Sequence, residues 1–151
     1  MKTKIHAIAG GIGFLTIAIF WTSTIATELF GSHEAIAQLK NSILWGMIIL
    51  IPSMAIAGAS GMSLGKGRVG ALVLRKKKRM PIIALNGLLV LLPSAIFLAS
   101  RASDGLFDTT FYAVQGIELL AGAVNLTLMA LNIRDGLRMT GKIRRSNVAK
   151  T

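Results

Sequence analysis

Four long apolar stretches constrain the fold of this chain more than any other feature of its sequence. They cover residues 5–27, 42–64, 80–100 and 110–133. A helix of about 20 residues crosses the roughly 30 Å hydrocarbon core of a bilayer, and each stretch is long enough to do so. Their only acidic or basic side chains are Glu118 and His6. The pattern predicts four transmembrane helices, and the hydrophobic fraction of 53% for the whole chain agrees with a membrane protein.

The connections between these stretches are short, so successive helices should be antiparallel neighbours. We therefore expect an all-α, integral-membrane four-helix bundle with up-down-up-down topology. Residues 1–151 would form a single membrane domain, with a basic loop at 65–79 and a basic tail at 134–151. Ser32 is a plausible N-cap that would extend the second helix beyond the membrane, and Asp104 and Asp108 are candidate caps for the fourth.

The basic residues are distributed unevenly between the two sides of this topology. The formal net charge is +11, and 15 of the 17 Lys and Arg residues precede the first stretch, separate the second from the third, or follow the fourth. Only Lys40 and Arg101 fall on the other side. The positive-inside rule therefore predicts that both termini and the basic loop lie in the cytoplasm. We interpret RKKKR at 75–79 as a topology signal that also contacts anionic lipid headgroups, and not as a nucleic-acid site.

Polar residues recur along the fourth stretch at helical spacing. Residues three or four apart share a helix face, and one face carries Gln115, Glu118, Gly122, Asn125, Met129 and Asn132. We expect this face to point into the bundle, where Gln115, Glu118 and Asn125 would form a buried polar seam with Asn86 of the third stretch. Glu118 would be either a protonated carboxyl that donates a hydrogen bond or a proton or ion site.

His6 is the residue best suited to bind a haem. The chain has only one other histidine, His33, and 27 residues of helix would separate the two by about 40 Å. Bis-histidine ligation within one chain is therefore excluded, but His/Met ligation of haem b is not. The candidate partners are Met62, Met80 and Met129, and Gly10 and Gly13 would leave room for the macrocycle. In the other interpretation, His6 is an interfacial polar residue.

A second group of candidate ligands lies on the side opposite the basic loop. Carboxylate and imidazole groups can bind divalent metals, and this side carries Glu28, His33, Glu34 and Asp108. The same residues could equally belong to capped loops. The chain has no cysteine, which excludes disulfides and thiolate metal sites. It also lacks hydrolase signatures such as H-E-x-x-H.

Several segments resemble a family of small four-helix inner-membrane proteins of proteobacteria. The segments that carry this resemblance are HAIAGGIGF, TELFGSHEA, ILWGMIILIP, RMPIIALNG, FYAVQGIELLAGAVN and LNIRDGLRM. The resemblance implies a location and a topology, and it carries over no functional residue. A looser likeness to four-helix b-type cytochromes rests on a boundary histidine and helical glycines, but a second histidine at the same depth is missing.

We therefore expect a non-enzymatic integral inner-membrane protein that acts as an accessory or oligomerising subunit. Its partners would be the lipid bilayer and either copies of itself or a larger membrane complex. Two alternatives stay open. One is a membrane-embedded b-type haem protein that exchanges electrons with a quinone and uses His6 as an axial ligand. The other is a proton- or ion-coupled conduit that uses Glu118.

Overall fold

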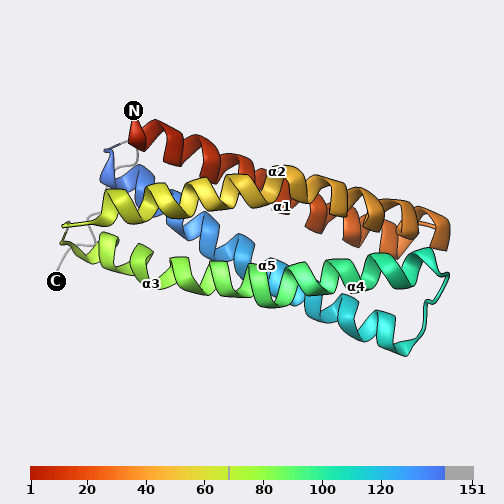
Figure 1. Ribbon diagram of the computed structural model, residues 1–151. Helices are drawn as coiled ribbons and strands as arrows, with labels where there is room; N and C mark the ends of the chain where they lie inside the picture. The colour runs from red at the N-terminus through yellow and green to blue at the C-terminus, as the bar shows by residue number, and fades with distance from the viewer. Residues whose placement is uncertain (68, 142–151) are drawn as a thin grey trace.

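The described part of the chain forms four long helical rods, which lie antiparallel in a bundle (Figure 1). The computed structural model describes residues 1–67 and 69–141. Its elements are α1 (Lys2–Phe30), α2 (His33–Gly65), α3 (Ala71–Asn86), the π-helical segment η1 (Gly87–Leu91), α4 (Leu92–Ser103) and α5 (Thr109–Met139). The segments α3, η1 and α4 form one continuous rod, Ala71–Ser103, and all four rods are long and apolar enough to cross a membrane. The predicted all-α membrane four-helix fold is confirmed.

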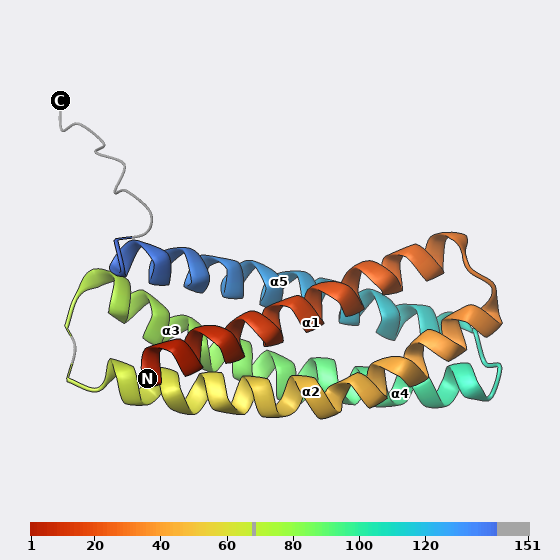
Figure 2. The ribbon, with the colours of Figure 1, turned by 90° about the horizontal axis from the view of Figure 1, so that it is seen from above.

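The two ends of the bundle differ in what they gather. The start of α1, the end of α2, the start of α3 and the end of α5 lie together at one end (Figures 1 and 2). We call this the basic end, because the run from Arg75 to Arg79 belongs to it. The α1–α2 and α4–α5 connections lie at the opposite end. This arrangement follows from the short connections, which force each rod to return beside its predecessor.

Side-chain caps fix the start of two helices at the end opposite the basic end. The Ser32 hydroxyl accepts a hydrogen bond from the backbone N–H of Ala35 at 3.2 Å, so α2 begins at His33 as the sequence predicted. Asp108 accepts from the backbone N–H of Phe111 at 3.0 Å and caps α5. Each bond satisfies one of the free donors of a first helical turn. Asp104, the other predicted cap, instead lies at the C-terminal end of α4.

The third rod changes its helical winding in the middle. Pro93 has no backbone N–H and cannot bond the carbonyl of Leu89, which leaves that acceptor without its helical donor. The π-helical segment η1 lies directly before this proline and spans Gly87–Leu91. Short π-helical segments commonly form where the regular hydrogen-bond ladder of a helix is interrupted. Asn86 is the last residue before η1, so the irregular turn adjoins the polar residues described below.

The predicted loop at 65–79 is largely helical, which corrects the prediction. Helix α3 begins at Ala71, so the run from Arg75 to Arg79 lies on a helix and only a short connection around Gly67 and Gly70 remains. Hydropathy detects the apolar part of a helix, whereas Lys and Arg continue a helix well without adding to that signal. In the predicted tail, α5 continues to Met139, and residues 142–151 lie outside the described part of the chain.

Glycine notches hold α1 between two other rods. A Cβ atom on Gly46 of α2 would collide with the ring of Phe20, and one on Gly122 of α5 would lie 2.8 Å from Cδ1 of Trp21. Small residues allow this close approach in membrane helices, where packing replaces the hydrophobic effect as the driving force. Large apolar side chains such as Trp45 and Leu120 remain 75% and 73% exposed, as expected of surfaces that contact lipid.

Candidate functional site

A seam of polar residues runs along the inner face of α5. The predicted stripe faces the bundle, because Gln115, Gly122, Asn125 and Met129 are buried while Ile117, Leu120 and Val124 are exposed. The polar side chains of this seam contact the other rods at three levels. We call them the lysine layer (Lys40, Gln115, Glu118), the asparagine layer (Asn86, Asn125) and the arginine layer (Arg79, Arg134, Asp135).

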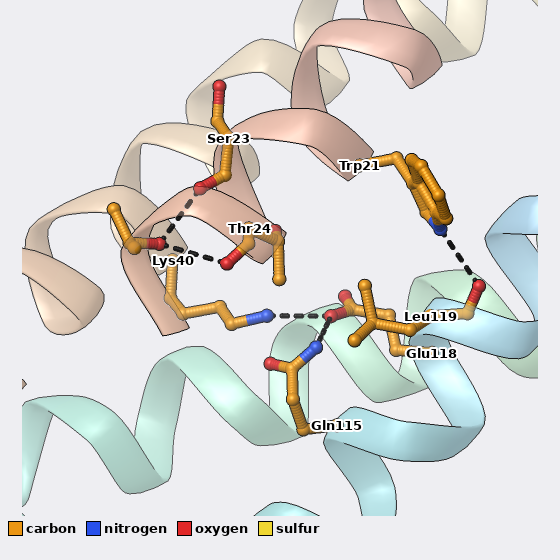
Figure 3. Close-up of polar contacts among 8 residues, drawn as sticks. Trp21, Ser23, Thr24, Lys40, Gln115, Glu118 and Leu119 are labelled. Carbon is orange, nitrogen blue, oxygen red and sulfur yellow. Dashed lines mark hydrogen bonds and ion pairs between the residues drawn. The ribbon is translucent and has the colours of Figure 1, made fainter. Parts of the chain in front are cut away.

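The lysine layer contains a buried ion pair that joins α2 to α5 (Figure 3). Lys40 Nζ donates to Oε2 of Glu118 at 2.6 Å, and the Lys40 side chain is only 1% exposed. Gln115 Nε2 donates to the same carboxylate oxygen at 3.0 Å. Oε2 of Glu118 thus accepts from two donors, and this geometry differs from the first of the two interpretations, a protonated carboxyl that donates a hydrogen bond. Burial of two charges is tolerated only when they compensate each other in this way.

Lys40 is one of the site residues that the sequence did not reveal. It lies outside the apolar stretches, on the side opposite most basic residues, and two turns inside α2. The available signal was its spacing, since the buried positions Ile36, Lys40 and Ile43 follow the helical pattern of four and three residues. Once Ser32 is accepted as the N-cap, that spacing places Lys40 on the inward face.

Within the part of the chain that the structure describes, one oxygen of the lysine layer and one oxygen beside it lack a hydrogen-bond donor. Oε1 of Gln115 and Oε1 of Glu28 are buried and have no hydrogen-bond partner among the described residues. Glu28, at the end of α1, is close enough to Lys40, Glu118 and His33 to interact with them electrostatically. Next to the lysine layer, the indole N–H of Trp21 donates a hydrogen bond to the carbonyl of Leu119 at 2.9 Å (Figure 3). The helices α1, α2 and α5 are thus joined by polar contacts within one region.

A cavity of about 60 Å³ adjoins the lysine layer. Its polar lining residues are Thr24 and Glu118, together with Trp21, and the remainder are apolar side chains from α1, α2, η1 and α5. Ordinary ligand pockets start at roughly 300 Å³. The cavity is therefore large enough for water but too small for a cofactor of the size of haem.

The asparagine layer joins α3 to α5 by side-chain amides. Asn86 Nδ2 donates to Oδ1 of Asn125 and to the carbonyl of Ala121, both at 2.8 Å. Asn125 Nδ2 donates in turn to the carbonyl of Ile83 at 3.3 Å. Asn86 and Asn125, both predicted to belong to the polar seam, are therefore in direct contact. Their amides link two helices and also satisfy backbone acceptors, which is a common use of Asn inside membrane bundles.

The arginine layer surrounds a fully buried carboxylate near the basic end. Arg79 Nη1 donates to Oδ2 of Asp135 at 2.7 Å, and Arg134 lies 3.4 Å from Oδ1. Asp135 is 0% exposed, and Arg79 also reaches Oδ1 of Asn132 at 3.4 Å. Sequence reasoning missed this layer because Arg79 and Asp135 were assigned to the loop and the tail. Extending the stripe three residues beyond Asn132 would have found Asp135.

The predicted haem-binding residues are only partly brought together. His6 Nδ1 lies 3.0 Å from the Ala57 carbonyl and 3.1 Å from the Ser60 hydroxyl. A Cβ on Gly61 would lie 3.0 Å from the ring of His6 and 2.8 Å from the methyl of Met80, so both side chains pack against Gly61.

The other four candidates for haem binding lie elsewhere. Met62 is 70% exposed, and Met129 is buried in a cluster with Ile17 and Ile83. The space beside Gly13 is filled by the sulfur of Met54, whereas Gly10 has open space beside it. Only Gly10 therefore leaves room for a macrocycle. With Met54 beside Gly13, a haem does not fit along the face that carries both glycines.

The structure does not bring the predicted outer metal ligands together. No group of three or more His, Asp and Glu side chains converges within the described ranges, which include Glu28, His33, Glu34 and Asp108. The ring of His33 stacks on Phe107 with centroids 4.1 Å apart, and Asp108 pairs with Arg101. The hydrogen bond from Phe111 and the nearby Arg101 guanidinium lower the pKa of Asp108. These residues therefore serve as loop and cap contacts.

Comparisons with protein-family models, with curated proteins and with solved structures find no match for this chain. The polar seam and the two ends of the bundle are therefore the features from which we infer its function.

Proposed function

We propose that the protein is an integral protein of the bacterial inner membrane that acts as an accessory or oligomerising subunit. The observation that carries this proposal is the internal pairing of the polar seam. Lys40 pairs with Glu118, Asn86 with Asn125, and Arg79 with Asp135. Each pair joins α5 to another rod at a different level. Polar contacts of this kind fix the register of membrane helices, which is a structural use of residues that are costly in a bilayer.

The outer surface of the bundle suits a protein that works by association. Exposed apolar side chains occur on every rod, including Leu15 on α1, Trp45 on α2, Leu88 on η1 and Leu120 on α5. In a membrane such a surface contacts either lipid or other apolar helices. We further propose that the basic end faces the cytoplasm, because cytoplasmic segments carry the excess of Lys and Arg. Both termini would then lie in the cytoplasm.

The test is to extract the full-length protein with its surrounding lipid, without detergent, and to determine its assembly by native mass spectrometry. We expect a homo-oligomer or a complex with other membrane proteins. Cross-linking in whole cells before extraction provides the control, because it captures contacts that existed in the membrane. A monomer in both experiments would overturn the proposal.

The same preparation distinguishes the two alternatives. An ultraviolet-visible spectrum with a Soret band that is lost in His6→Ala would favour the haem protein, and a colourless sample from haem-replete cells would exclude it. Reconstituted vesicles with a pH-sensitive dye test the conduit. Proton flux that disappears in a folded variant lacking both Lys40 and Glu118 charges would favour transport over association.

A further inference from the structure

The arginine layer belongs to a larger cluster of cations at the basic end. Helix α3 contributes Lys76 and Arg79, and α5 contributes Arg134 and Arg138. The two helices pack side by side there (Figure 2). Asp135 is the one carboxylate that the described residues place between them. The cluster therefore combines four cations with one anion.

Helical spacing separates these cations from the other basic residues of α3. Lys76 and Arg79 are three residues apart and half-buried, whereas Arg75, Lys77 and Lys78 are exposed. Arg134 and Arg138 are four residues apart on α5 and also half-buried. Residues at these spacings share a face, so each helix turns one pair of cations toward the other. Like charges on one face repel each other unless an anion compensates them.

Asp135 cannot compensate the whole cluster. Its Oδ2 accepts from Arg79 and its Oδ1 from Arg134, so both oxygens are engaged. The Lys76 ammonium lies 3.3 Å from where a Cβ on Gly136 would be, against the backbone of α5. Nε of Arg138 is buried and has no acceptor within the part of the chain that the structure describes. Among the described residues, neither Lys76 nor Arg138 therefore donates a hydrogen bond to this carboxylate.

We propose that Lys76 and Arg138, supported by the arginine layer, bind a phosphate group at the basic end of the bundle. A phosphate supplies several acceptor oxygens, which suits one ammonium and the Nε–H of one guanidinium. The two sources of such a group are the headgroup of an anionic phospholipid and free phosphate. The position of the site favours a lipid headgroup as the source of the phosphate, because the ends of membrane-spanning helices lie at headgroup depth. This inference goes beyond association within the membrane and does not depend on it.

The experiment measures the thermal stability of the full-length protein in a neutral detergent while ligand is added. The probes are phosphatidylglycerol, phosphatidylcholine with the same acyl chains, and inorganic phosphate at constant ionic strength. We expect phosphatidylglycerol to raise Tm in a saturable manner and phosphatidylcholine to have little effect. In the variant with Lys76→Gln and Arg138→Gln, the phosphatidylglycerol concentration at the midpoint of the Tm rise should increase at least about 10-fold. A charge-assisted hydrogen bond contributes at least that factor to the affinity.

The matched control is Lys78→Gln, which removes the same charge from an exposed position of the same helix. We expect it to change the midpoint by less than about 2-fold, because exposed charges contribute little. An equal loss in the control would overturn the proposal in favour of diffuse attraction to the basic run. Saturation by inorganic phosphate that is also weakened in the double variant would support the site and identify free phosphate as its source.

A second variant keeps the proposal testable if the double variant does not fold. Arg138→Lys retains the charge but removes the Nε–H that the structure buries, so it should weaken binding several-fold relative to the wild type. Binding by Arg138→Lys at wild-type strength would show that Arg138 does not contact the phosphate and would overturn its assignment.

Discussion

The lysine layer and the arginine layer are both buried ion pairs that involve α5, but they differ in charge balance and in access. In the lysine layer one cation, Lys40, pairs with one carboxylate, Glu118, and the Lys40 side chain is 1% exposed. In the arginine layer two guanidinium groups share Asp135, while Arg79 and Arg134 are 17% and 43% exposed. The first has little exposed surface, with Glu118 13% exposed, and the second reaches more of the surface at one end of the bundle through Arg134.

This difference separates two uses of charge in one bundle. A pair with this little exposed surface suits a packing role between α2 and α5, because it offers few atoms to an external ligand. A cluster with more cations than carboxylates and with exposed side chains can bind an external anion. The two layers therefore predict different responses to substitution, to salt and to added lipid.

The largest effect is expected from Glu118→Gln. The amide keeps the shape of the side chain but leaves the Lys40 ammonium buried without a counter-charge, which should cost about 3–5 kcal/mol of unfolding free energy. The measurement is reversible unfolding in mixed micelles with increasing denaturing detergent. An unchanged midpoint would show that the Glu118 carboxyl is already neutral in the native protein.

The control for this prediction removes both charges together. The variant with Lys40→Met and Glu118→Gln should recover most of the lost stability, because replacing a whole buried pair by uncharged groups is often neutral. Together with Lys40→Met alone, the three variants complete a double-mutant cycle. Additive effects would mean that the two side chains do not interact.

A smaller effect is expected from Asp135→Asn. The substitution removes the carboxylate, but Arg79 and Arg134 are partly exposed and can extend toward water or headgroups. We expect a loss of about 1–2 kcal/mol, measured by the same unfolding assay. Added salt should partly compensate the loss by screening the remaining cations. A loss as large as that of Glu118→Gln, unaffected by salt, would remove the contrast between the two layers.

The sequence was sufficient to predict the features that depend on periodicity. The four rods follow from the length of the apolar stretches, and the inward stripe of α5 from the spacing of Gln115, Glu118 and Asn125. Asn86 was expected in the same polar seam, and it contacts Asn125. These predictions rest on geometry that regular helices share, and tertiary contacts did not change them.

The sequence was not sufficient to find the partners of the buried charges. Lys40, Arg79 and Asp135 lie outside the apolar stretches. Arg79 and Asp135 were expected in a loop and a tail but are helical, and Lys40 was expected beyond the membrane. An ion pair also depends on which faces of two helices meet, and one sequence does not determine that rotation. Glu118 was therefore recognised as buried, while the lysine that compensates it was not.

The smallest effect is expected at the pair formed by Arg101 and Asp108, which gives an exposed reference for the two buried layers. Asp108→Asn keeps an oxygen that can cap α5 but removes the charge, and Asp108 is 51% exposed. The pKa of Asp108 is lowered in the folded protein, first by the hydrogen bond from Phe111. Because the pKa is lowered, the charge of Asp108 stabilises the fold when the pH is above the pKa of the unfolded chain, about 3.9. This contribution is lost as the pH falls through the lower pKa of the folded protein. The Tm difference between the wild type and Asp108→Asn should therefore be small at neutral pH and should shrink further in acid. A difference that grows in acid would contradict this sign and would indicate that the cap, and not the charge, was disturbed.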